Sequence, residues 1–243
     1  MNIQPFTFAS LRSALGEGWR LANATRGVSI AYSLLFVLGG VAIMGGLLAQ
    51  GWTPFVIAAA GAFMLIGPVI LAGFFGIAQA QEAGEVVGFG AVVRGFTAAA
   101  GALWALALVC GLLFMIFLTD AAILYAYMVG REAVWLTDLL PAATGVASFV
   151  KWAALSGLVV ALLLFCISAF SVPLLCERRA DLVEAVAISV RVVFGNFGSA
   201  ILWAFLLSTA TIVSILLLPL LPLTLPWLAY ASRALYRQVL PVR

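Results

Sequence analysis

The chain has no histidine, a single lysine and few charged residues of either sign. Charged side chains make up 9% of its 243 residues, whereas a typical soluble domain has about 25%. Without histidine the chain lacks the most frequent general base, the most frequent zinc ligand and the side chain that titrates near neutral pH. These absences exclude histidine-dependent catalysis, histidine-ligated haem and histidine-based pH sensing.

Cysteine is scarce too, with Cys110, Cys166 and Cys176 as its only occurrences. They lie in or beside apolar runs and show no CxxC spacing, so the sequence indicates neither a disulfide framework nor a thiolate metal site. We interpret all three as small buried hydrophobic residues.

Sequence motifs of catalysis are also missing. The glycines Gly88 and Gly90 lack the third glycine of a dinucleotide-binding loop, and Lys151 stands in no phosphate-binding loop. No GxSxG or HExxH motif occurs. We therefore expect a protein that is not an enzyme and that uses no cofactor or metal.

Apolar residues, by contrast, are abundant. They make up 65% of the chain, and the mean hydropathy is +1.22. There is too little polar surface to cover a water-soluble globule, so lipid is the expected solvent for most of the chain. The net charge is +3, but the basic residues stand in ones and twos beside apolar stretches. We interpret them as membrane orientation signals and expect no nucleic-acid partner.

The apolar runs predict an all-α, polytopic membrane protein. A helix needs about 20 apolar residues to cross about 30 Å of hydrocarbon, and the last run is too long for one crossing, so we divide it at Pro219 to Pro222. The whole chain, 1–243, is expected to form one membrane domain of three helical hairpins, each made of two apolar spans. The predicted spans are 28–50, 55–80, 98–119, 152–175, 198–217 and 221–235.

The distribution of basic residues predicts the orientation. With six spans, only Arg131 and Lys151 lie on one side of the membrane. The other side holds Arg12, Arg20, Arg26, Arg94, Arg178, Arg179, Arg191, Arg233, Arg237 and Arg243. Because basic residues concentrate in cytoplasmic segments, both termini are expected to be cytoplasmic.

An amphipathic segment precedes each predicted hairpin. We expect a cytoplasmic interfacial helix within 1–27, a second within 181–194, and a shorter one over 85–96. The apolar stripe of the first is Phe8, Leu11, Leu15, Trp19 and Ala22, and that of the second is Leu182, Val183, Val186, Val190 and Val193. We interpret the chain as three copies of an interfacial helix followed by a hairpin, all in one orientation.

Asp120 is the carboxylate that interrupts an otherwise apolar run. A charge at the bilayer centre costs about 2.5–3.5 kcal/mol on insertion scales, which favours a polar or ion site. The alternative is a hydrated position at the interface, because about 20 residues from Ala98 reach the outer boundary near residue 118. We favour the interfacial position.

Hydroxyl side chains and small residues also mark the spans. Ser208, Thr211 and Ser214 share one helical face, and Ser168 and Ser171 lie near the end of the fourth span. They either line a polar path or bond to backbone carbonyls and neighbouring helices, and we favour the second. Residues that permit close helix approach are Gly73, Gly76, Gly101, Ala105, Gly157 and Ala161.

Four arginines follow the fourth span or end the sixth: Arg178, Arg179, Arg233 and Arg237. They are candidate contacts for anionic lipid headgroups. The alternative, which we favour, is that they extend to the cytoplasmic interface because membrane orientation already demands basic residues there.

The most specific signal begins near the end of the fourth span. The stretch is Ser171-Val172-Pro173-Leu174-Leu175-Cys176-Glu177-Arg178, followed by Ala185, Ser189, Arg191, Asn196, Gly198 and Trp203. It closely resembles a bacterial integral membrane family known as domain of unknown function 2189, as do Glu82-Ala83-Gly84-Glu85 and the segment 226–237. The resemblance covers most of the chain from the second span on and is strongest over the last third. It implies a six-span protein of the bacterial inner membrane with no established activity.

The sequence differs from the family pattern at positions where a functional site is conceivable. Tyr230 and Ala234 occupy positions that commonly hold histidines in the final helix, and Gln79, Ala80 and Gln81 replace arginines after the second span. If the histidines bind a metal or haem in relatives, this chain has lost that site.

Two functions fit these observations. The first is a non-enzymatic accessory or assembly subunit that associates laterally with a larger inner-membrane complex or with itself. The second is a carrier or binder of lipid-like or apolar small molecules, in which arginines contact headgroups. In both, membrane lipids are partners.

Overall fold

The structure, a computed structural model, describes residues 4–53, 55, 67–98, 100–130 and 144–241. The described residues form helices and no strand. The elements in chain order are α1 (Phe8–Ala24), α2 (Arg26–Ala49), α4 (Gly67–Glu82), α5 (Phe89–Ala98), α6 (Ala100–Met128), α7 (Thr144–Ser168), α8 (Ser171–Cys176), α9 (Leu182–Gly195), α10 (Phe197–Leu216), the 3₁₀ turn η2 (Leu218–Leu220) and α11 (Leu221–Val239). The all-α prediction is confirmed.

Four helical segments of the described chain are long and apolar enough to cross a membrane. They are Arg26–Ala49, Gly101–Met128, Val146–Cys176 and Phe197–Leu216, which correspond to the predicted first, third, fourth and fifth spans. Part of the predicted second span, 56–66, lies outside the described residues. The sixth coincides with α11, which is more polar than these four and largely buried. The six-span topology therefore stays a prediction.

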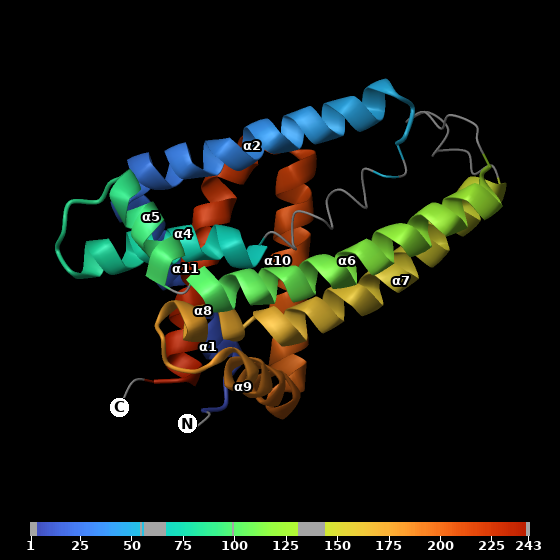
Figure 1. Cartoon of the computed structure of the whole chain (residues 1–243). Coiled ribbons are helices and arrows are strands. Elements are labelled where there is room, and N and C mark those ends of the chain that lie inside the picture. Colours follow the sequence, from blue (N-terminus) through green and yellow to red (C-terminus); the bar gives the residue numbers. More distant parts are fainter. Residues whose placement is uncertain (1–3, 54, 56–66, 99, 131–143, 242–243) are drawn as a thin grey trace.

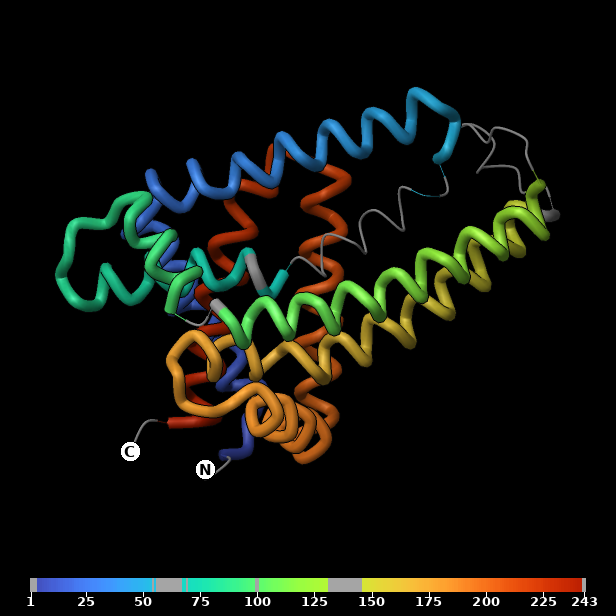
Figure 2. Tube along the Cα trace, viewed as in Figure 1, coloured from blue at the N-terminus to red at the C-terminus, as the bar shows by residue number. Residues whose placement is uncertain are grey.

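The helices converge at one end of the molecule (Figure 1). The two described ends of the chain lie close together there, beside α1, α9 and the end of α11. From this end α6 and α7 extend side by side as an antiparallel pair, and α2 extends separately (Figure 2). The apolar core lies at the converging end and includes Phe75, Leu106, Leu174, Val192 and Tyr236 from five helices.

Helix α1 packs against α11, because small residues let the two backbones approach. Gly18 lies against Ala231, so closely that a β-carbon on Gly18 would collide with the α11 backbone. The buried residues of α1 are Leu11, Ala14, Gly18 and Ala22, whereas Phe8 and Trp19 are exposed. The segment is helical as predicted, while its interfacial position stays a prediction, and its predicted apolar stripe is divided between the protein core and the exposed surface.

The predicted apolar stripe of α9 holds in part, since Val193 is buried and Leu182, Val186 and Val190 are half-buried. The buried residues of α9 are Ala185, Ile188, Ser189, Val192 and Val193, while Val183 is 81% exposed. The small residues Ala185 and Ser189 face the protein because α9 packs closely on α7 and α8. The stripe that hydrophobicity predicts therefore lies beside the most buried face of α9.

The predicted fourth span, 152–175, begins earlier and contains a break. Helix α7 starts at Thr144 and ends at Ser168, and α8 follows from Ser171. Pro173 has no backbone N–H to continue the helical hydrogen bonding. Ser189 of α9 stabilises the break, since its hydroxyl accepts a hydrogen bond from the Phe170 N–H at 3.2 Å and donates one to the Cys166 carbonyl at 2.7 Å.

Of the remaining boundaries, the turn before the last predicted span agrees with the prolines that predicted it, whereas the end of the third span lies further along the chain. Helix α10 ends at Leu216 and α11 begins at Leu221, so the predicted turn at Pro219 to Pro222 is confirmed. Helix α6 continues nine residues past the predicted end of the third span at 119, to Met128.

Candidate functional site

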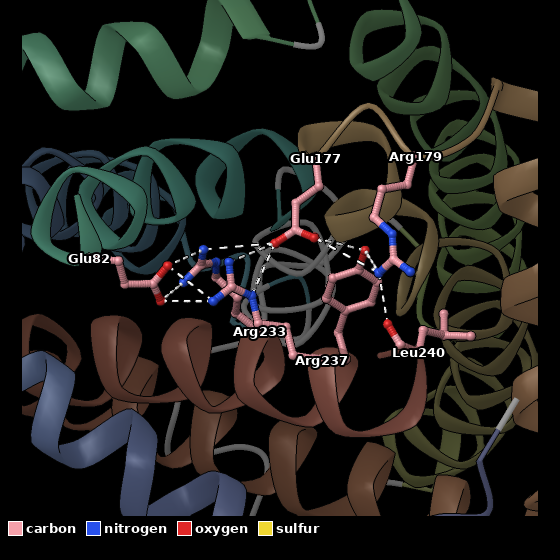
Figure 3. A network of polar contacts seen from close by, with 7 residues as sticks. Glu82, Glu177, Arg179, Arg233, Arg237 and Leu240 are labelled. Carbon is pink, nitrogen blue, oxygen red and sulfur yellow. Dashed lines mark hydrogen bonds and ion pairs between the residues drawn. The ribbon is translucent and has the colours of Figure 1, made fainter. Parts of the chain in front are cut away.

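The arginines predicted at the end of the last span lie in a cluster of charged side chains from three parts of the chain (Figure 3). Arg233 and Arg237 are one turn apart on α11. They face Glu82, the last residue of α4, and Glu177, the residue after α8. With Arg179, these residues form what we call the arginine–glutamate cluster.

Arg233 is the most enclosed member of the cluster, with 3% of its side chain exposed. Its Nη1 donates to Glu82 Oε1 at 2.5 Å and its Nη2 donates to Glu82 Oε2 at 3.0 Å. A second carboxylate, Glu177 Oε1, lies 3.8 Å from Nη2. Two-pronged pairing of this kind satisfies both charges, which a buried guanidinium requires.

Arg237 joins the same two carboxylates from the outer side. Its Nη1 lies 3.0 Å from both oxygens of Glu82, and its Nε donates to Glu177 Oε1 at 3.2 Å. Its side chain is 41% exposed, so solvent screens these pairs more than those of Arg233.

Arg179 connects the cluster to the end of the chain. Its Nη1 donates to the Tyr236 hydroxyl and to the Leu240 carbonyl, both at 2.7 Å. The Tyr236 hydroxyl donates in turn to Glu177 Oε2 at 3.0 Å. The guanidinium also lies 5.5 Å from the centre of the Tyr236 ring, within the range of a cation–π contact.

The charges of the cluster shift its ionisation. Burial alone would raise the pKa of the Glu82 carboxyl, but hydrogen bonds and attraction from Arg233 and Arg237 outweigh burial and lower that pKa below 4.5. Burial and the nearby Glu177 raise the pKa of the Tyr236 hydroxyl. Burial opposes the charge of Arg237, but attraction to Glu82 and Glu177 raises its pKa overall. The lowered pKa of Glu82 and the raised pKa of Arg237 therefore both favour the charged forms that pair with each other, while the Tyr236 phenol stays neutral at physiological pH.

The arginine–glutamate cluster holds three helix ends together, and we also call it the clamp. Each carboxylate contacts two or more guanidinium groups, and the pairs join the ends of α4, α8 and α11. Strong pairing leaves neither carboxylate positioned as a free base or nucleophile. In the described part of the chain, no group of three cysteine, aspartate and glutamate side chains is placed to hold a metal ion.

Among the predicted headgroup contacts, the structure brings three into this cluster and leaves one apart. Arg179, Arg233 and Arg237 have protein partners within it, and the Arg233 side chain faces the interior. Arg178 is exposed, and its Nε donates to the Ala98 carbonyl at the end of α5. Headgroup contact and extension to the cytoplasmic interface both stay predictions for the four arginines.

Asp120 lies on an exposed face of α6, 20 residues after the start of the helix at Ala100. That distance is about 30 Å of helix, roughly the thickness of the hydrocarbon layer. No ion pair joins Asp120 to another described residue. Both of its alternative roles stay predictions.

The hydroxyl groups mostly bond to backbone carbonyls. Ser168 donates to the Leu164 carbonyl and Ser214 to the Ala210 carbonyl, at 2.7 and 2.6 Å, and Ser171 donates to the Ile167 carbonyl. Thr224 of α11 donates to the Ser214 hydroxyl at 2.7 Å and so joins α10 to α11. The interpretation of these three serines as backbone and interhelical partners is confirmed.

Sequence reasoning missed both carboxylates of the cluster as site residues. Glu82 and Glu177 entered as residues of the family resemblance, and Glu177 also as the charge that ends an apolar run. A usable signal exists, because each is the first acidic residue after an uncharged run, where the ends of hairpins on the same side of a membrane can meet.

A second buried polar group was missed as well. The Tyr230 hydroxyl lies 2.7 Å from Ser29 Oγ, and Thr25 Oγ1 donates to it at 3.2 Å. Tyr230 is 1% exposed. Its hydroxyl therefore belongs to a buried network that joins the start of α2 to α11.

The described residues are helical, and four of their segments have the length and apolar composition of membrane spans. A family model described as "Predicted integral membrane protein (DUF2189)" matches residues 55–177, just over half of the chain. The chain belongs to this family. The matched segment contains Glu82 and ends at Glu177, so the resemblance after Arg178 lies outside it. Searches of curated proteins and of solved structures found no match.

Proposed function

We propose that this chain is a non-enzymatic, multi-pass protein of the bacterial inner membrane with both termini cytoplasmic. We further propose that it acts as an accessory or assembly subunit that associates laterally with a larger membrane complex or with itself. The observation that carries this proposal is the exposed small-residue face of α2.

Helix α2 is the candidate span that is least buried against the rest of the chain. Its first half packs against α4 and α11 through Ser29, Tyr32 and Ser33. The exposed residues of its second half include the small residues Gly39, Ala42, Gly45, Gly46 and Ala49, beside the large residues Leu38, Val41, Ile43 and Leu48. A β-carbon added at Gly39, Gly45 or Gly46 would meet no atom of the described residues within 4 Å.

Small residues at this spacing are typical of helix–helix contacts in membranes, because they let backbones approach closely. The chain uses the same device internally, where Gly76 of α4 meets Gly95 of α5 and Gly18 meets Ala231. Lipid tails gain little from a surface of glycine and alanine. The α2 face is therefore suited to a helix of a partner.

The cluster supports the proposed topology. Glu82, Glu177 and Arg237 follow the second, fourth and sixth predicted spans, and a direct contact among them requires these three ends to lie on one side of the membrane. Hairpins whose second spans all end on the cytoplasmic side satisfy this requirement.

The test is extraction in mild detergent, followed by mass spectrometry and size measurement of the complex. We expect a stoichiometric protein partner or a defined oligomer with the unaltered chain. Gly46→Leu should remove it, whereas Val41→Leu, which adds bulk at an exposed position on another side of α2, should retain it. An unpartnered monomer, or a Gly46→Leu chain that keeps its partner, would contradict the proposal.

The second candidate function, binding of lipid-like molecules, is favoured by a specific groove beside Arg178. A co-purified lipid in the absence of any protein partner would favour that function over the first.

A further inference from the structure

The groove lies where α5, α6, α8 and α9 meet and has a volume of about 680 Å³. It is separate from the α2 face and from the carboxylates of the clamp. Its apolar side comes from Gly101, Ala102 and Leu175, and its polar side comes from Arg178, Asp181 and Glu184.

The position of the groove matches the boundary between hydrocarbon and water. Gly101 is the first residue of one candidate span, and Leu175 is the penultimate residue of another. The charged residues 178–184 follow directly after that second span. A molecule in this groove therefore contacts apolar helix ends on one side and charges on the other, which is the environment of a phospholipid headgroup and its glycerol.

Arg178 is held in this groove in an unfavourable backbone conformation. Its φ is 52°, in the left-handed region, at the helix-ending position where glycine is preferred. The N–H groups of Arg178 and Arg179 bond to the Leu175 and Leu174 carbonyls, which fixes this turn. An arginine here costs backbone energy that a glycine would avoid, so the retained side chain points to a role for the guanidinium.

Three charged groups around the groove lack a charged partner in the described part of the chain. Arg178 uses its Nε on the Ala98 carbonyl, which leaves its terminal nitrogens for another acceptor. Asp181, the N-cap of α9, and Glu184 in its first turn are exposed and make no ion pair with a described residue. Arg179 also borders the groove, but its guanidinium is held by Tyr236 and Leu240.

The free charges select the chemistry of the occupant. One guanidinium suits a phosphodiester, and two carboxylates suit a primary ammonium. A purely anionic headgroup would satisfy Arg178 but would meet two unpaired carboxylates. A trimethylated ammonium would supply charge but no N–H donor. We infer that the groove binds a zwitterionic phospholipid with an ethanolamine headgroup, its phosphate at Arg178 and its ammonium at Asp181 and Glu184.

The experiment uses the full chain purified in detergent and equilibrated with equal amounts of phosphatidylethanolamine, phosphatidylglycerol and phosphatidylcholine. Native mass spectrometry then counts the lipids retained by each protein molecule. We expect one phosphatidylethanolamine retained in preference to the other two by at least about tenfold, since hydrogen bonds between charged groups contribute that much.

The variants separate the two halves of the headgroup. Arg178→Ala should reduce retention of phosphatidylethanolamine by about tenfold or more. The double variant Asp181→Asn with Glu184→Gln should abolish the preference over phosphatidylglycerol. Matched controls are Arg191→Ala and Glu17→Gln, both exposed and away from the groove, which should bind lipid like the unaltered chain.

Two results would overturn the inference. One is an unaltered chain that does not prefer phosphatidylethanolamine over both other lipids. The other is a preference that persists in the double variant. Folding of each variant is checked by heating with a thiol-reactive dye, because Cys110, Cys166 and Cys176 are all buried in the folded chain. A loss of the predicted α2 partner leaves this measurement unaffected, so the two proposals can fail separately.

Discussion

Arg233 is a guanidinium within the last predicted span that is almost fully enclosed by protein. Its charge is tolerated because Glu82 binds it with two hydrogen bonds and Glu177 lies beside it. Removing one partner of such a pair costs more than the pair contributes, because a buried charge is then left uncompensated. The stability of the converging end therefore depends on single carboxylates.

Glu82→Gln tests this dependence through pH. Folding lowers the pKa of Glu82 below its ordinary 4.5, so its stabilisation is complete above pH 4.5 and is lost as the pH falls through the folded value. At pH 7 the variant should lose about 1–2 kcal/mol, an estimate reduced for the partial exposure of Glu82.

The measurement is the thermal midpoint in detergent as a function of pH, and the variant should show a weaker acid dependence than the unaltered chain. Glu85→Gln is the control, because Glu85 pairs with Arg94 at an exposed site. Equal losses at pH 7 in the two variants would contradict the assignment of Glu82 to the clamp.

Arg178→Gly provides a second residue-scale prediction. Glycine relieves the left-handed backbone at φ 52°, and the relief exceeds the loss of one exposed hydrogen bond. The folded chain should gain about 0.5–1 kcal/mol in the thermal dye assay, while its lipid retention falls. Arg191→Gly, inside α9, should instead lose about 1 kcal/mol. Destabilisation by Arg178→Gly would show that Arg178 has only a structural role.

At the scale of elements, helix approach depends on glycine at particular crossings. Gly76 of α4 and Gly95 of α5 lie face to face, and a β-carbon on Gly95 would meet the Gly76 backbone at 3.0 Å. Such crossings position α4, and therefore Glu82 at its end. The two helices form a tight unit beside α2 and α11 (Figure 1).

Gly95→Ala and Gly90→Ala make the same change in one helix and should have opposite effects. At Gly95 the added methyl group collides with backbone, which should cost about 1–3 kcal/mol. At Gly90 no atom of the described chain lies within 4 Å of the added methyl group, and alanine should be neutral or stabilise α5 by up to about 1 kcal/mol. Thermal midpoints of the two variants measure the difference. A similar loss in both would contradict the close crossing.

The sequence predicted helix boundaries where a proline or a charged residue determines them. Proline set the turn before α11, and the charges at Arg26 and Glu177 bounded apolar runs. The buried faces of α1 and α9 followed only in part, because Gly18, Ala185 and Ser189 are selected by how closely two backbones approach. Small size at a crossing is visible only when both helices are known.

At the scale of the whole molecule, apolar composition predicted the membrane environment and the helical fold, and charge asymmetry predicted an orientation. The clamp did not follow from these patterns, because Glu82 and Glu177 meet Arg233 only after chain segments more than 50 residues apart have converged. The family match supports the membrane environment, while the partner and orientation rest on the proposals above.

The central claim is that the arginine–glutamate cluster and the amphipathic helices face the cytoplasm, while the turns after α2 and α10 face outward. Single cysteines at Trp52, Leu217, Glu85 and Arg191, all exposed, test it with a membrane-impermeant maleimide on intact cells. The buried native cysteines give little background. We predict labelling of Trp52→Cys and Leu217→Cys in intact cells, and of Glu85→Cys and Arg191→Cys only after permeabilisation. Labelling of Glu85→Cys or Arg191→Cys in intact cells would contradict the account.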